Sequence, residues 1–344
     1  GATARTFSAL PGAQAAFALL CEANADAPAG GPVAIASRPL WLYGAGNLGR
    51  LARAHLDVVG QEISGVVDRN AADYAGSSAW SGLDVQDPAA VPTKTKADAL
   101  LAVSVVTTPF VPLRAALLAA GWGEVVPFYD VADAFRHRHP LSNGWFAETM
   151  DNAALGRASE VLAGLADDAS HAHYLRFAAW RLCRQEWDFP SAPVTTGDRF
   201  FIPEICAAFR HGECVLDAGA HRGELAPKFH AALGERLAKL WAIEPDPASL
   251  AALHAAKADW PAALGERVTI IDAVLAEEAG RRRFHAGLDY ASQIVASGQC
   301  ERDAVPLDAL GLEKVSLVGN SFGGALALWL GAGALVAARF REVR

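Results

Sequence analysis

The chain has 344 residues, of which 52% are hydrophobic and 20% are charged, and its formal net charge is −8. This composition excludes wholesale disorder, and an acidic balance that is spread along the chain disfavours a nucleic-acid-binding surface. The length predicts about two domains. The five cysteines are scattered without a C-x-x-C pair, and the first residues lack the pattern of a secretory signal. We therefore expect a soluble, cytoplasmic protein with reduced thiols.

The first 135 residues are predicted to form a helix and then an α/β domain. Residues 1–37 are rich in Ala, Pro and Gly and predict one helix followed by a linker. In residues 38–135 apolar runs alternate with helical segments, which predicts a Rossmann-like domain with parallel strands. Its first unit is a strand over 40–43, a glycine turn, a helix over 50–59 and a second strand that ends at Asp68.

The glycine turn of this domain has the sequence GAGNLG, a complete G-x-G-x-x-G with Gly44, Gly46 and Gly49. Glycines let the backbone approach a phosphate at the N-terminus of the next helix, and Asp68 stands where a ribose-binding carboxylate belongs. These four residues are a candidate nucleotide site. Tight packing of the strand on the helix is the alternative explanation for the same glycines.

Residues 136–212 have leucine and aromatic residues at helical spacing, which predicts a helical connector. Two H-x-H pairs lie in this segment, His137 with His139 and His171 with His173. On a helix this spacing points the two side chains in different directions, and no cysteine or carboxylate cluster joins them. We therefore expect no metal site.

From residue 213 the α/β alternation resumes, and three predicted strands end in the carboxylates Asp217, Glu244 and Asp272. A DAGAHRG turn with Gly219 and Gly223 begins at the first of them. The carboxyl ends of adjacent parallel strands face the ligand crevice of an open sheet, so we expect the three acids to line one site. Such a lining suits a ligand with hydroxyls, amines and positive charge. For any single one of these acids, the alternative role is to cap the N-terminus of a helix.

Three segments of this region, "VLDAGAHRGELAPKF", "LWAIEPDPASLAAL" and "VTIIDAVLAEEAGRRRFHAG", resemble S-adenosylmethionine-dependent methyltransferases of the FkbM type. The upstream "LWLYGAGNLGRLARAHL" is similar to the Rossmann-like domain that is often fused ahead of such enzymes. The resemblance covers most of residues 38–318. It implies an α/β protein with two Rossmann-like parallel-sheet domains, the second over 213–344, joined by the helical connector.

The resemblance also implies a cofactor, S-adenosylmethionine, and a reaction, in-line methyl transfer to a hydroxyl of a sugar, glycan or natural product. Nothing in the sequence selects one acceptor, a catalytic base or an oligomeric state. The residues implied to surround the cofactor are Asp217, Gly219, Ala220 and Gly223 at the methionine and ribose, Glu244 at the ribose hydroxyls, and Asp272 and Ala273 at the adenine.

One segment departs from the family pattern. After its fourth core strand the family carries K-x-D-x-E-G-A-E, whereas this chain has GNSFGGAL, so that four ionisable positions are occupied by Gly319, Ser321, Gly323 and Leu326. The further strands that would complete a seven-stranded sheet do not follow. We therefore expect an altered or incomplete C-terminal part. A non-catalytic module that binds a nucleotide or nucleotide-sugar is the alternative function.

The same segment contains a G-x-S-x-G motif at residues 319–323, in the strand-to-helix context of a nucleophile elbow. A serine hydrolase that uses Ser321 is thus a second alternative. In α/β-hydrolases the acid and the histidine of the triad follow the serine along the chain. In the given sequence Glu342 is the one acid after Ser321 and no histidine follows, so we predict a structural turn. The uncharged stretch 315–338 is long enough to span a membrane, yet its glycines and polar residues favour a buried strand, turn and helix.

Overall fold

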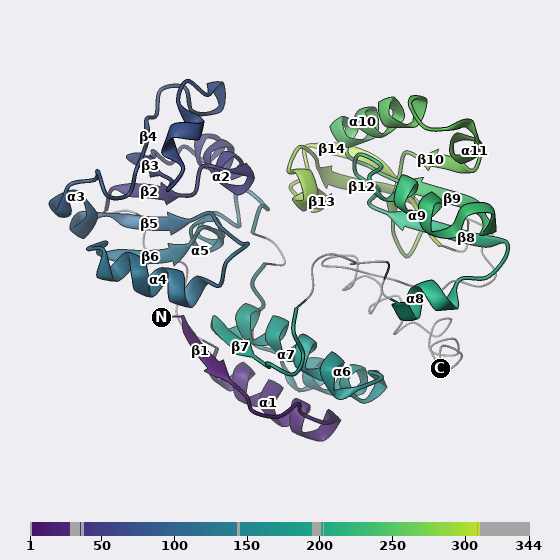
Figure 1. Cartoon of the computed structure of the whole chain (residues 1–344), viewed down its shortest axis with the longest axis horizontal. Helices are drawn as coiled ribbons and strands as arrows, with labels where there is room; N and C mark the ends of the chain where they lie inside the picture. Colours follow the sequence, from purple (N-terminus) through teal and green to yellow (C-terminus); the bar gives the residue numbers. More distant parts are fainter. Residues whose placement is uncertain are drawn as a thin grey trace. The chain divides into compact units, whose positions relative to one another are not determined.

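The computed structural model describes residues 2–27, 35, 38–142, 145–194, 201, 203–307 and 309. The chain divides into two compact units, Gly1–Pro193 and Val194–Arg344. Each unit combines helices with parallel strands, which confirms the predicted fold class (Figure 1). The finer limits expected from the sequence, at residues 37, 135 and 212, stay predictions.

The first unit contains a five-stranded sheet in the order β4-β3-β2-β5-β6, and all of its pairs are parallel. Every residue of β2 and β5 is buried, as expected for central strands that are covered on both faces. The strands are β2 Leu40–Tyr43, β3 Gly65–Val67, β4 Val85–Gln86, β5 Leu100–Val103 and β6 Glu124–Pro127. The helices of this part are α2 Asn47–Val58, η1 Ala71–Tyr74, η2 Ser78–Trp80, α3 Thr93–Asp98, α4 Phe110–Ala119 and α5 Phe128–Asp133.

The rest of the first unit is a helical layer with a two-stranded parallel pair, β1 with β7. Buried side chains such as Leu20, Leu162 and Leu175 join its three helices in one core. The predicted N-terminal helix therefore packs on the predicted helical connector. The elements are β1 Thr3–Thr6, α1 Ala13–Ala25, α6 Asn152–Gly164, α7 Asp168–Cys183 and β7 Gln185–Asp188.

The second unit is built on a three-stranded parallel sheet in the order β10-β9-β8. Its core is formed by buried residues of these strands and of α9 and α10, for example Leu240, Phe229 and Leu253. The elements of this part are α8 Pro203–Ala208, β8 Glu213–Ala218, α9 Leu225–Leu233, η3 Gly234–Arg236, β9 Leu237–Ile243, α10 Pro247–Ala258, α11 Ala262–Gly265 and β10 Val268–Ile271.

A mixed sheet in the order β11-β14-β12-β13 follows in the second unit, and the sequence analysis predicts none of its four strands. β12 is antiparallel to β14 and carries three consecutive arginines, so it lacks the apolar pattern of a strand. Ion pairs across the strands compensate, since Arg281 lies 3.0 Å from Asp303 and 3.6 Å from Glu301. The elements are β11 Val274–Leu275, β12 Gly280–His285, η4 Asp289–Ala291, β13 Gln293–Ile294 and β14 Cys300–Val305.

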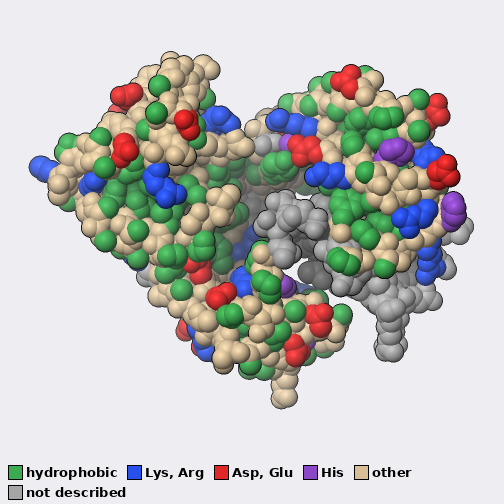
Figure 2. Space-filling view, viewed as in Figure 1, with side chains coloured by type: hydrophobic (Ala, Val, Ile, Leu, Met, Phe, Trp, Pro, Cys, Tyr) green, Lys and Arg blue, Asp and Glu red, His purple; other side chains and the backbone are tan. Residues whose placement is uncertain are grey.

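The predicted fourth core strand at 315–318 and the uncharged stretch 315–338 lie outside the described residues. Within the residues that are described, no helix has the length and apolar character needed to cross a membrane. Acidic and basic side chains are interspersed on the visible face of each unit (Figure 2).

Candidate functional site

Two of the predicted acids, Asp217 and Glu244, come together at the carboxyl ends of the neighbouring strands β8 and β9. Both side chains are buried, with the residues only 9% and 5% exposed. Burial, and then the charge of Glu244, raise the pKa of Asp217 to about 6. Within the described part of the chain, the Oδ2 atom of Asp217 has no hydrogen-bond partner. This buried acceptor is therefore available to a donor or a cation from a ligand.

Glu244 is held by two backbone N–H groups. Its Oε2 accepts a hydrogen bond from the amide of His221 at 2.7 Å, and its Oε1 accepts one from the amide of Asp246 at 2.8 Å. Burial raises the pKa of Glu244, and these two hydrogen bonds oppose that rise. The carboxylate is thus fixed between the glycine turn that follows β8 and the turn that begins α10.

The glycine turn after β8 has one open position and two packed ones. Gly219 and Gly223 have φ values of 81° and 82°, which favour glycine. A Cβ on Gly219 would meet no atom within 4 Å, whereas one on Gly223 would lie 2.6 Å from a methyl group of Leu253. Ala220 is buried and its amide donates to the carbonyl of Ile243. A ligand can thus approach the backbone at Gly219, while Gly223 is required by packing.

The third predicted acid has a different partner. The exposed carboxylate of Asp272 forms an ion pair with Arg302 on β14, which fastens the end of β10 to the mixed sheet. Ala273, which the resemblance places at an adenine pocket, is only 2% exposed. Of the three predicted acids, Asp217 and Glu244 form the buried pair, and the place of Asp272 and Ala273 at an adenine stays a prediction.

Asp246 is a residue of this site that the sequence analysis missed. Its Oδ1 caps α10 by accepting from the amides of Ala248 and Ser249, at 3.0 and 3.1 Å. Its Oδ2 accepts from the amide of Gly287 at 2.6 Å and from the hydroxyl of Ser292 at 2.9 Å. Burial acts to raise the pKa of Asp246, but these hydrogen bonds hold it below its ordinary value.

An aromatic pair adjoins the carboxylates. The ring of His221 stacks on that of Tyr290, with 4.3 Å between the centroids and 25° between the planes. Tyr290 belongs to η4 in the loop between β12 and β13, and it is 74% exposed. The loop that carries it is the one that Asp246 holds.

In the first unit the four residues of the predicted nucleotide site also come together. The carboxylate of Asp68 accepts from the amides of Ala45 and Asn70, both at 2.8 Å. Gly44 has a φ of 104°, and a Cβ on Gly49 would collide with the carbonyl oxygen of Gly44. Beside a Cβ on Gly46 the nearest atom would be the Tyr74 hydroxyl, at 3.8 Å. The first and third glycines therefore serve the turn and its packing, whereas a Cβ on the second would make only an ordinary van der Waals contact.

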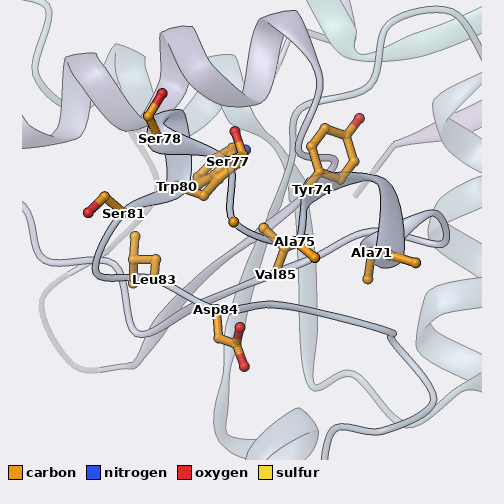
Figure 3. Close-up of a pocket in the computed structure, with 12 residues that line it drawn as sticks. Ala71, Tyr74, Ala75, Ser77, Ser78, Trp80, Ser81, Leu83, Asp84 and Val85 are labelled. Atoms are coloured by element: carbon orange, nitrogen blue, oxygen red, sulfur yellow. The ribbon is translucent and has the colours of Figure 1, made fainter.

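A cavity of about 440 Å³ borders this first glycine turn. It is lined by residues of η1, of η2 and of the segment that leads into β4, including Tyr74, Trp80 and Asp84 (Figure 3). The indole N–H of Trp80 donates to the carbonyl of Ala45 at 3.1 Å, which fastens the lining to the turn.

The remaining candidates do not add to either site. His171 is buried, and its two ring nitrogens lie 3.1 and 2.9 Å from the carbonyl oxygens of Pro11 and Leu162, so it joins helices of the first unit. In the portion of the chain that is described, no group of His, Cys, Asp and Glu could hold a metal ion. The G-x-S-x-G motif with Ser321 lies outside the described residues.

The chain was compared with known proteins at three levels. No family model matches it, and no curated protein matches it in sequence. Among solved structures it is similar to the methyltransferase FkbM from Methylobacillus flagellatus KT, with a TM-score of 0.51 and 16% identity, over 95% of this chain and 87% of that chain. At this identity the similarity establishes the fold alone. The chain therefore has a fold distantly similar to that of an FkbM methyltransferase.

Proposed function

We propose that this protein is an S-adenosylmethionine-dependent O-methyltransferase whose cofactor binds at the carboxylate pair of the second unit. The observation that carries the proposal is the Oδ2 atom of Asp217, which is buried beside Glu244 without a hydrogen-bond partner among the described residues. Open space at Gly219 lies on the same turn. An acceptor-rich site of this kind fits a ligand that has hydroxyls, an amine and a positive charge. The fold similarity to an FkbM methyltransferase supports the same conclusion.

The residues of the site have separate tasks in this proposal. Glu244 accepts hydrogen bonds from the ribose hydroxyls, and Asp217 and the Gly219 backbone hold the methionine part. When bound, the cofactor supplies an activated methyl group, which a hydroxyl oxygen of a sugar, glycan or natural product accepts by in-line displacement. The protein contributes mainly alignment to such a step. Free thiols at all five cysteines support a cytoplasmic location.

Calorimetric titration of the full chain with S-adenosylmethionine tests this proposal. We expect binding by the wild type and at least about tenfold weaker binding by Glu244→Gln, because a charged acceptor of hydrogen bonds is lost. The matched control is Asp68→Asn, which changes the equivalent acid of the first unit. This acid also accepts two backbone amides, and we expect the affinity of this variant to equal that of the wild type.

Two results would contradict the proposal. The first is an absence of heat and of any change in melting temperature at millimolar S-adenosylmethionine. The second is weaker binding by Asp68→Asn with normal binding by Glu244→Gln, which would move the site to the first unit.

A second candidate function, nucleotide binding by the first unit, is favoured by the cavity beside the glycine turn, since the Tyr74 hydroxyl that lies nearest to a Cβ on Gly46 belongs to its lining. Titration with a nucleotide such as UDP or NAD is the reciprocal arm of the same experiment. If the nucleotide binds to the first unit, we expect Asp68→Asn to weaken its binding and Glu244→Gln to leave it unchanged.

A further inference from the structure

We propose that Tyr290, stacked on His221, makes the carboxylate site selective for a positively charged ligand, so that it binds the sulfonium of S-adenosylmethionine more tightly than the neutral product S-adenosylhomocysteine. This inference rests on the proposed function. It adds a specificity-determining residue from a loop outside the three core strands.

The aromatic pair is directly connected to the two acids. The amide of His221 donates to Glu244 at 2.7 Å, and the ring of the same residue stacks on Tyr290. Glu244 in turn is close enough to Asp217 for its charge to raise the pKa of that carboxyl. Contacts therefore join the aromatic pair to Glu244, and the charge of Glu244 acts on Asp217 at the end of the neighbouring strand.

The position of Tyr290 is fixed on both sides. Before it, the amide of Gly287 donates to Asp246 at 2.6 Å, and after it, the hydroxyl of Ser292 donates to the same oxygen at 2.9 Å. The amide of Leu288 donates to the Ser292 hydroxyl at 3.0 Å, which closes the loop on itself. The Tyr290 side chain is 74% exposed and therefore contributes little to the core. The hydrogen bonds of its loop nevertheless fix the position of the ring.

This arrangement suits a cation for two reasons. The face of a tyrosine ring attracts a positive charge within about 6 Å of its centroid. A positive charge also relieves the repulsion between the two buried carboxylates. The amine of the methionine part is charged in both forms, but the thioether of the product lacks the sulfonium charge. Methyl transfer therefore removes the attraction to the tyrosine ring and part of the relief at the carboxylates, and favours release of the product.

The test compares the dissociation constants of the two cofactor forms for the full chain and for Tyr290 variants. We expect Tyr290→Leu to bind S-adenosylmethionine roughly three- to tenfold more weakly and S-adenosylhomocysteine within about twofold of the wild type. Tyr290→Phe keeps the ring and is expected to bind both as the wild type does. Phe177→Leu, which changes an exposed aromatic residue of α7, is the matched control and is expected to change neither constant.

The outcomes separate this inference from the proposed function. Equal weakening of both ligands by Tyr290→Leu would show contact with their shared parts and overturn the selectivity for charge. Unchanged binding of both would remove Tyr290 from the site. A wild-type chain that binds neither ligand overturns the proposed function and this inference with it. The melting temperatures of the unliganded variants, expected within one or two degrees of the wild type, confirm that they are folded.

Discussion

At the scale of single residues, ionisation of the buried Asp217 carboxyl lowers the free energy of unfolding of the unliganded protein. The folded chain raises the pKa of this carboxyl from 3.8 to about 6, because the group is buried and faces Glu244. Between these two pKa values the folded state holds a proton on Asp217 that the unfolded state releases. The free energy of unfolding therefore falls as the pH rises from about 4 to 6, and above pH 6 the ionised side chain destabilises the unliganded fold.

Replacement of this side chain is expected to stabilise the unliganded protein. Asp217→Asn should increase the free energy of unfolding at pH 7.5 by up to about 3 kcal/mol, since the amide carries no charge. At pH 4 most of this gain should disappear. Urea denaturation at the two pH values measures both. The control Asp259→Asn changes an exposed acid after α10 and should stay within about 0.5 kcal/mol at either pH. A gain that is equal at pH 7.5 and pH 4 would show that ionisation of Asp217 is not its cause.

Sequence reasoning found some residues of the site and missed others for a physical reason. Asp217 and Glu244 could be located because the ends of neighbouring parallel strands always meet at one edge of a sheet. Asp246 precedes a proline, which is a signal for a helix N-cap, and the structure shows that cap. Its second oxygen contacts residues 287 and 292, and such a contact depends on how a distant loop folds back. Tyr290 was missed for the same reason.

At the scale of elements, β7 stabilises a helix of the five-stranded part. The carboxylate of Glu186 on β7 accepts from the amides of Phe110 and Val111, the latter at 3.0 Å, at the first turn of α4. The residue before this helix is Pro109, which supplies no side-chain cap. A carboxylate at a helix N-terminus satisfies free N–H groups and complements the helix dipole.

We expect Glu186→Ala to lower the free energy of unfolding by roughly 1 to 2 kcal/mol through loss of this cap. Glu186→Gln should recover part of the loss, because an amide oxygen still accepts one hydrogen bond. Denaturation in urea measures the difference, and the control is Glu160→Ala, at an exposed position of α6. If Glu186→Ala and Glu160→Ala have equal stability, the cap makes no net contribution.

The elements differ in how well their sequences predict them. β2, β3 and β5 are short apolar runs between glycine turns and helices, so the pattern was sufficient. β12 and β14 are rich in charge and contain few buried residues, chiefly Phe284 and Ala304. Their stability depends on cross-strand ion pairs that a single segment cannot reveal.

At the scale of the whole molecule, each unit has cores of its own, so we expect two unfolding transitions in calorimetry. Excess S-adenosylmethionine should raise the transition of the second unit by several degrees and leave the other unchanged. Leu175→Ala, in the core of the helical layer, should lower only the transition of the first unit, and so identifies it. A ligand-induced shift of the transition that Leu175→Ala lowers would contradict the assignment of the site.

The pairing of β1 with β7 has a consequence for the order in which the polypeptide is made. Thr3 pairs with Gln185 and Thr6 with Asp188, so β1 has no partner strand until roughly 180 further residues have been synthesised. At about 5 to 20 residues per second, the strand waits on the order of 10 to 40 s at the ribosome. The five-stranded sheet, which ends at residue 127, can form during that interval. The helical layer of the first unit, whose first helix precedes the sheet and whose other helices follow it, therefore cannot be completed until the whole sheet has been synthesised.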